Sequence, residues 1–133
     1  EDMNVGSTQH FLPVALGAGD RGLFRQCSNT MTSSFLEPNL KLLSQFHLLE
    51  DVTTVIRRSE MMTQRLDELL PELPGKRADF LKLDVQGYEL EVLRGAETTL
   101  CSALVIHTEV EFVEMYEKQA LFADVDACLR LPS

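Results

Sequence analysis

The stretch from Asp79 to Ala96 constrains the fold of this chain more than any other feature. It begins with the short apolar segment Phe80–Val85, which is typical of a strand, and Gly87 then marks a tight turn. Apolar residues at helical spacing follow the turn, and they are Leu90, Leu93, Ala96 and Leu100. A second apolar segment, Ala103–Val110, completes a strand–helix–strand unit, whose strands we expect to be joined by a right-handed crossover.

Two charged side chains lie inside the first of these strands. Because side chains alternate faces along a strand, Lys82 and Asp84 share one face with Phe80. Charges are rarely placed in a buried strand without a purpose. Asp84 also lies next to the carboxyl end of the strand, where open parallel sheets bind their ligands. Asp84 is therefore the first candidate for a catalytic or cofactor-binding carboxylate.

The second strand offers two further candidates. Glu109 lies at its end and shares a face with His107. If the two strands are neighbours, Asp84 and Glu109 open onto the same crevice, where two carboxylates position an acceptor or hold a divalent metal. The sequence does not supply a full set of oxygen ligands, so we predict no metal. His107 is a candidate proton acceptor, although a histidine in a strand is more often a hydrogen-bonded core residue.

The segments Asp79–Glu89, Val92–Ala96 and His107–Val110 together resemble the FkbM-type methyltransferases. The family pattern at the first strand is close to Lys-Ile-Asp-Val-Glu-Gly, and this chain has Gln86 where glutamate is usual. Other segments follow the family order, and they are Ala15–Gly17 before a β-hairpin, Thr63–Leu69, and a last helical region with Tyr116, Gln119, Phe122 and Leu129. The resemblance covers the chain from about Pro13 to Leu129.

This resemblance implies a Rossmann-like α/β fold and methyl transfer from S-adenosylmethionine to a hydroxyl of a sugar or small natural product. It implies that Asp84, Gly87 and Glu89 contact the cofactor and, by analogy with the fold, that Leu16 and Gly17 border its adenine. Asp84 would be a base or an orienting group for the acceptor hydroxyl, as a base only if its pKa were raised.

Two of these residues also have structural interpretations. Lys82 is expected to pair with an acidic group and hold it in place. Glu89 falls in the first turn of the helix, where the helix dipole favours an acid.

The family's cofactor-binding start, a strand that leads into a glycine-rich turn, is not evident in the sequence. Asn4–Ser7 resembles such a turn faintly, but no apolar strand precedes it, and we predict a loop. The chain stops at Leu131–Ser133, before the closing hairpin that this fold has. We therefore expect residues 1–133 to form one partial, truncated methyltransferase domain that is inactive by itself.

Two alternatives stay open. A degenerate methyltransferase-like module that acts in protein interaction is favoured by the missing glycine turn and by Gln86. A nucleotide- or NAD-binding enzyme would need a Gly-x-Gly-x-x-Gly turn after a strand, and the sequence has none.

The net charge of −9 disfavours nucleic acid and anionic membranes as partners, but not a neutral glycan or small-molecule acceptor. No apolar segment approaches the ~20 residues of a membrane span. The three cysteines are scattered, which argues against disulfides and zinc and favours the cytoplasm. We expect Cys101 and Cys128 to pack as small apolar groups. Open sheet edges of a partial domain would favour homo-oligomers.

The remaining elements are predicted from local patterns. We expect strands at Phe11–Leu16, Leu23–Cys27 and Val52–Ile56, a short helix around Leu40–Phe46, a helix from an N-cap at Thr63 through Leu70, and a helix at Ala120–Leu131 that buries Leu121, Val125 and Leu129.

Overall fold

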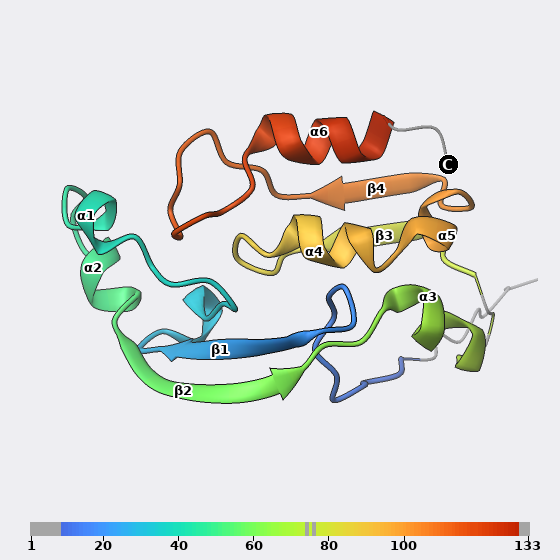
Figure 1. Ribbon diagram of the computed structural model, residues 1–133, viewed down its shortest axis with the longest axis horizontal. Helices are drawn as coiled ribbons and strands as arrows, with labels where there is room; N and C mark the ends of the chain where they lie inside the picture. The colour runs from blue at the N-terminus through green and yellow to red at the C-terminus, as the bar shows by residue number, and fades with distance from the viewer. Residues whose placement is uncertain (1–8, 74, 76, 131–133) are drawn as a thin grey trace, which may run out of the picture.

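The computed structural model describes residues 9–73, 75 and 77–130, and it shows a mixed α/β chain (Figure 1). The predictions for Asn4–Ser7 and Leu131–Ser133 lie outside the described residues. The strands are β1 (Arg21–Cys27), β2 (Val55–Met62), β3 (Phe80–Leu83) and β4 (Val105–Thr108). The helices are η1 (Thr30–Thr32), α1 (Leu40–Leu43), α2 (Leu49–Val52), α3 (Leu66–Leu69), η2 (Leu70–Glu72), α4 (Glu89–Arg94), α5 (Glu97–Leu100) and α6 (Phe122–Arg130).

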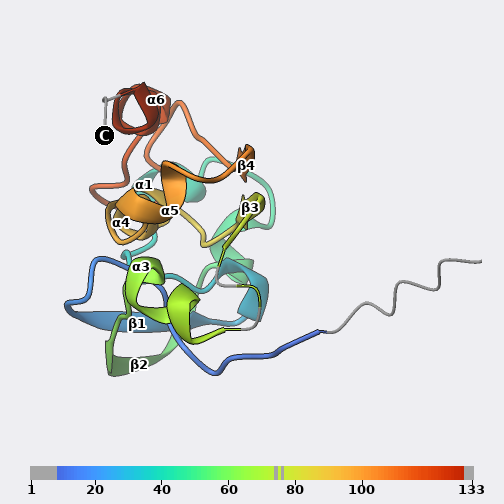
Figure 2. The same ribbon diagram turned by 90° about the vertical axis from the view of Figure 1, so that its right-hand side faces the viewer.

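The described strands form two separate sheets. β1 and β2 pair antiparallel across a connection that contains η1, α1 and α2, and β3 and β4 pair in parallel. The strand–helix–strand unit expected between Phe80 and Val110 is thus confirmed. Helices α4, α5 and α6 lie on one side of β3 and β4, and β1 and β2 lie on the side of α4 away from α6 (Figures 1 and 2).

The core lies between β3 and the helices on that side. Leu83 on β3, Val92 and Leu93 on α4, and Val125 on α6 form one buried cluster. Each side chain is at most 3% exposed, so burial of apolar surface from three elements holds α4 and α6 against β3. This packing places the β3–α4 turn at one end of the core.

The opposite face of β3 is not buried, which corrects the expectation of charges inside a buried strand. Phe80 on β3 is 59% exposed and Val105 on β4 is 51% exposed, whereas Leu83 points to the core. The side chains of Lys82 and Asp84 are 51% and 36% exposed. Lys82 and Asp84 therefore keep contact with water, and their place in a strand does not by itself indicate a function.

The helix predicted from the turn to Leu100 is divided at Gly95. Helix α4 ends at Arg94, and α5 begins at Glu97. A Cβ atom on Gly95 would come within 2.0 Å of the carbonyl oxygen of Gly17. The close approach of the segment before β1 therefore explains the glycine, the end of α4 and the break together.

Predictions for β1, β2 and the segment before them were partly wrong. Phe11–Leu16 forms no strand: Phe11 is 89% exposed, and Leu16 makes one isolated parallel bridge, to Gln64. Val52 belongs to α2, and β2 runs from Val55 through exposed polar residues whose backbone pairs with β1. Backbone pairing, rather than an apolar pattern, defines this strand.

Thr63 is not a helix N-cap. Arg65 occupies the N-cap position of α3, without a side-chain hydrogen bond. The Thr63 hydroxyl instead accepts hydrogen bonds from the backbone N–H groups of Gly19 and Asp20, at 3.1 and 3.0 Å. Thr63 thus ties the end of β2 to the turn before β1.

The last helix is confirmed in position, but only part of its predicted face is buried. Val125 is 3% exposed, whereas Leu129 is 38% exposed and Leu121 is half-buried.

Cys101 is exposed rather than packed, and Cys128 is half-buried. In the part of the chain that the structure describes, no helix has the length and apolar character to cross a membrane.

Candidate functional site

Asp84 and Glu109 follow directly on the carboxyl ends of two neighbouring parallel strands. Leu83, the last residue of β3, pairs with Thr108, the last residue of β4. One step earlier, Lys82 pairs with His107. The expectation that the two strands are adjacent is confirmed, and these four polar side chains gather at one edge of the sheet.

The carboxylate of Asp84 is held by two donors on its two oxygens. The Lys82 ammonium group donates to Oδ2 at 2.9 Å, which confirms the predicted ion pair, and the Gln86 side-chain amide donates to Oδ1 at 3.1 Å. The Lys82 and Gln86 hydrogen bonds lower the pKa of Asp84 below its ordinary value, and the positive field of His107 adds to this effect. The same pair raises the pKa of Lys82.

The partial exposure of Asp84, its two hydrogen bonds and its lowered pKa favour an orienting role over that of a general base. A general base works best when its pKa lies near the working pH, and burial is the usual cause of such a rise. Asp84 is instead partly exposed and doubly hydrogen-bonded. The geometry favours a permanently ionised group that orients a donor or faces a cation.

The turn after Asp84 is built from two residues with positive φ. Gln86 has φ 54° and Gly87 has φ 89°, a left-handed conformation that glycine adopts readily and other residues rarely adopt. A Cβ on Gly87 would also come within 2.9 Å of the Gln119 side-chain nitrogen. The buried Ser34 hydroxyl donates to the Gln86 carbonyl at 2.7 Å. The turn is therefore fixed from both sides.

Glu89, in the first turn of α4, is 3% exposed. Its Oε1 accepts a hydrogen bond from the Val85 N–H at 3.0 Å, so the side chain closes the strand-to-helix turn. Burial raises the pKa of Glu89, against the opposing effect of the backbone hydrogen bonds. Glu89 thus has a structural role, which is to close this turn. Contact of Glu89 or Gly87 with the cofactor stays a prediction.

Three residues outside the predicted site join this edge of the sheet. The Gln119 amide, buried against Gly87, donates to Glu111 Oε2 at 2.7 Å, and Gln119 Oε1 accepts from the Tyr116 N–H at 3.1 Å. Burial raises the pKa of Glu111, and the nearby charges of Glu89 and Glu109 raise it further. Tyr116 and Gln119 belong to the residues that resemble the family, so the sequence pointed to them. No sequence pattern pointed to Glu111.

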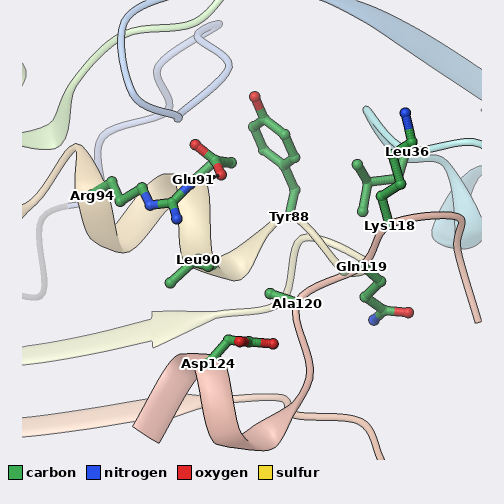
Figure 3. A pocket seen from close by; sticks show the side chains of 10 residues that line it. Leu36, Tyr88, Leu90, Glu91, Arg94, Lys118, Gln119, Ala120 and Asp124 are labelled. Atoms are coloured by element: carbon green, nitrogen blue, oxygen red, sulfur yellow. Dashed lines mark hydrogen bonds and ion pairs between the residues drawn. The ribbon is translucent and has the colours of Figure 1, made fainter. Parts of the chain in front are cut away.

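A cavity of about 270 Å³ adjoins the other side of the Gly87 turn. Figure 3 shows Leu90 of α4 and Asp124 of α6 on opposite walls, with Gln119 and Ala120 at one end. Asp84 does not line this cavity. A larger groove of about 870 Å³ lies along α4, α5 and α6, with mostly apolar walls.

Leu16 and Gly17 are not brought to the same place as Asp84. Leu16 packs against the core, and Gly17 lies against Thr63 and against Gly95, just past the end of α4. The turn at Gly87 precedes the first residue of α4, and a six-residue helix spans ~9 Å. Contact of Leu16 and Gly17 with an adenine ring stays a prediction.

In the described residues, no group of three or more His, Cys, Asp or Glu side chains has a metal-binding arrangement.

A family model described as "Methyltransferase FkbM domain" matches residues 5–131. The chain belongs to the FkbM methyltransferase family. This family member is also 39% identical over 57 residues to the 2-O-methyltransferase NoeI of Sinorhizobium fredii. The match covers 43% of the chain and 24% of the relative, so the chain spans about a quarter of that protein. No solved structure matches the chain significantly.

Proposed function

We propose that this chain is part of a Rossmann-like domain that transfers a methyl group from S-adenosylmethionine to a hydroxyl oxygen. Membership of the FkbM methyltransferase family carries this proposal. The parallel β3–β4 pair, with Asp84 and Glu109 after its carboxyl ends, supports it, because such edges bind ligands in open α/β sheets. The name of NoeI, a 2-O-methyltransferase, supports an oxygen acceptor, for which a sugar or small natural product is the class we propose.

The residues at this edge fit a cationic cofactor. The lowered pKa of Asp84 favours its ionised form, its side chain is partly exposed, and Glu109 directly follows the end of the neighbouring strand β4. Asp84, Gly87 and Glu89 would hold the cofactor, with the backbone of the turn at Gly87 allowing close approach. When bound, S-adenosylmethionine supplies a methyl group on a positively charged sulfur.

The chain's own contribution is mainly alignment. The carboxylate of Asp84 accepts a hydrogen bond from the acceptor hydroxyl and points its oxygen toward the methyl group. Lys82 and Gln86 keep the carboxylate ionised while it does so. As the acceptor oxygen is methylated, the hydroxyl proton leaves along its hydrogen bond to Asp84. His107 on β4 and Glu109 just after β4 are the neighbouring groups that we propose take this proton up from Asp84.

The test compares Asp84→Asn with Asp79→Asn in the intact protein. Asp79 precedes the amino end of the same strand, where its 69% exposed side chain pairs with Arg77. We expect Asp84→Asn to reduce methyl transfer to hydroxyl acceptors far more than it weakens S-adenosylmethionine binding, and Asp79→Asn to change neither. Unchanged transfer in Asp84→Asn removes that residue from the proposed role.

A non-catalytic interaction module is the second candidate. The uncovered apolar side chains Phe80 and Val105 on the outer face of β3 and β4 favour it, because such patches often mark interaction sites. A second copy of the chain, paired through the sheet edges, is the partner we propose in that case. Calorimetry separates the candidates: binding of S-adenosylmethionine by the intact protein supports the enzyme, and its absence supports the module.

A further inference from the structure

Gln86 makes the connection between the strand-to-helix turn and the Asp84 carboxylate. Its side-chain amide donates to Asp84 Oδ1, while Lys82 donates to Oδ2. Two donors on the two oxygens of one carboxylate fix both its rotation and its tilt. We propose that Gln86 is a positioning residue, which holds the Asp84 carboxylate in the orientation used at this edge of the sheet.

The backbone of Gln86 is held firmly enough for this role. The Ser34 hydroxyl, in a residue that is 2% exposed, donates to the Gln86 carbonyl at 2.7 Å. The left-handed φ of 54° persists only where surrounding contacts enforce it. The connection between β1 and β2 therefore fixes Gln86 through Ser34, and Gln86 in turn fixes Asp84.

The orientation of the Gln86 amide follows from its neighbours. A flipped amide would turn its carbonyl oxygen toward the Asp84 carboxylate, so the nitrogen must face Asp84. Its Oε1 then lies 3.4 Å from the Tyr116 hydroxyl. That hydroxyl has a single proton, and the shorter contact, 2.8 Å to the Thr32 carbonyl, takes it. Asp84 is thus the dominant partner of the Gln86 side chain.

A neutral amide at position 86 has an electrostatic consequence. The charged and titratable groups around Asp84 are Lys82 on β3, His107 on β4 and Glu109 just after β4. A glutamate in place of Gln86 would put a second carboxylate within hydrogen-bond distance of Asp84, and such pairs share a proton. With the neutral Gln86 there, Asp84 has no carboxylate at position 86 with which to share a proton. The consequence for methyl transfer rests on the proposed function.

The experiment follows the carboxyl carbon of Asp84 by carbon-13 NMR during a pH titration of the full chain. Gln86→Glu should raise the pKa of Asp84 by about 1 pH unit and couple its titration to the new carboxyl group. Gln86→Asn suits a left-handed backbone but is one methylene too short to reach Oδ1, so it should also raise that pKa. Amide spectra confirm that each variant is folded. If Gln86→Glu does not fold, the titration of Gln86→Asn tests the proposal by itself.

Gln45→Glu is the matched control. Gln45 is exposed, and its amide donates to the Lys41 carbonyl at 3.1 Å. The same change of charge there should leave the Asp84 titration as in the wild type. An Asp84 titration that is identical in wild type, Gln86→Asn and Gln86→Glu overturns the proposal.

Methyl transfer by the same variants separates this proposal from the proposed function. If Asp84 acts as proposed, Gln86→Asn lowers kcat about tenfold and leaves the KM for S-adenosylmethionine unchanged. A shifted Asp84 pKa with unchanged kcat supports the positioning role of Gln86 and contradicts the proposed role of Asp84 in transfer.

Discussion

Gly95 lies so close to the backbone of Gly17 that a Cβ atom at position 95 would come within 2.0 Å of the Gly17 carbonyl oxygen. These residues are 78 positions apart (95 − 17), and their contact joins the segment before β1 to the end of α4. Gly95 has φ −83°, so its backbone is unstrained and only the close contact requires glycine.

Gly95→Ala should therefore destabilise the chain by about 3 kcal/mol, because the contact atom is backbone and cannot move aside. Urea unfolding measures this loss. Gly75→Ala is the control, since Gly75 has φ 93° and a Cβ there would meet no atom of the described residues within 4 Å. It should cost only about 1 kcal/mol of backbone strain. A loss at Gly95 no larger than at Gly75 would contradict the contact.

Asp67 joins α3 to the beginning of α5. Its carboxylate accepts hydrogen bonds from the N–H groups of Thr98 and Thr99, at 2.9 and 2.8 Å, and from the Thr99 hydroxyl at 2.8 Å. Burial opposes the charge of Asp67, but these hydrogen bonds outweigh it and lower the pKa of its carboxyl group. Asp67→Ala should cost about 1–2 kcal/mol at pH 7.

The pH dependence of the Asp67 effect has a definite sign. A lowered pKa in the folded state gives stability that is present at neutral pH and is lost as the pH falls through that pKa. The difference in the free energy of unfolding between wild type and Asp67→Ala should therefore become smaller at acidic pH. Asp51→Ala, an exposed first-turn acid of α2, should change stability by no more than about 0.5 kcal/mol. If this difference in stability stayed constant from pH 7 to pH 3, the hydrogen bonds of Asp67 to the first turn of α5 would not be its cause.

Glu89 should show the opposite pH dependence. Burial raises the pKa of its carboxyl group above the ordinary value of 4.5. A raised pKa gives stability that is fully present in acid and is lost as the pH rises through the folded-state pKa. Glu89→Gln keeps an oxygen that accepts the Val85 N–H, so it should be more stable than wild type at pH 8 and lose that advantage below pH 4.5.

Urea midpoints at several pH values test the Glu89 prediction. Glu68→Gln, at an exposed first-turn position of α3, serves as its control and should show no comparable gain at pH 8. The prediction fails if Glu89→Gln is as sensitive to pH as the wild type.

Lys82 should matter for the site but little for stability. Its ammonium group pairs with Asp84 at 2.9 Å on an exposed face, and such surface pairs contribute about 0–1 kcal/mol. Lys82→Met should change the urea midpoint very little, raise the pKa of Asp84 and reduce methyl transfer by the intact protein. Lys41→Met, on the exposed side of α1, should have none of these effects. A large loss of stability would show that the pair is structural.

Local patterns in the sequence were sufficient to predict the parallel unit from Phe80 to Thr108, its order and the position of Asp84 at the strand end. Period-two and period-3.6 spacing and a glycine turn are properties of neighbouring residues, so they are visible without a partner. The Lys82–Asp84 pair was predictable for the same reason, because both side chains lie on one face two residues apart.

Tertiary structure alone decided which surfaces these elements bury and which distant residues meet. Phe11–Leu16 has the composition of a strand, but in the described residues its pairing is limited to one isolated bridge, from Leu16 to Gln64. By contrast, β2 is a strand because β1 pairs with its polar residues. The helix breaks at Gly95 because Gly17, far away in the chain, occupies the space of a side chain there. The Ser34–Gln86–Asp84 connection and the burial of Glu89 depend likewise on packing between layers, which short-range periodicity does not encode.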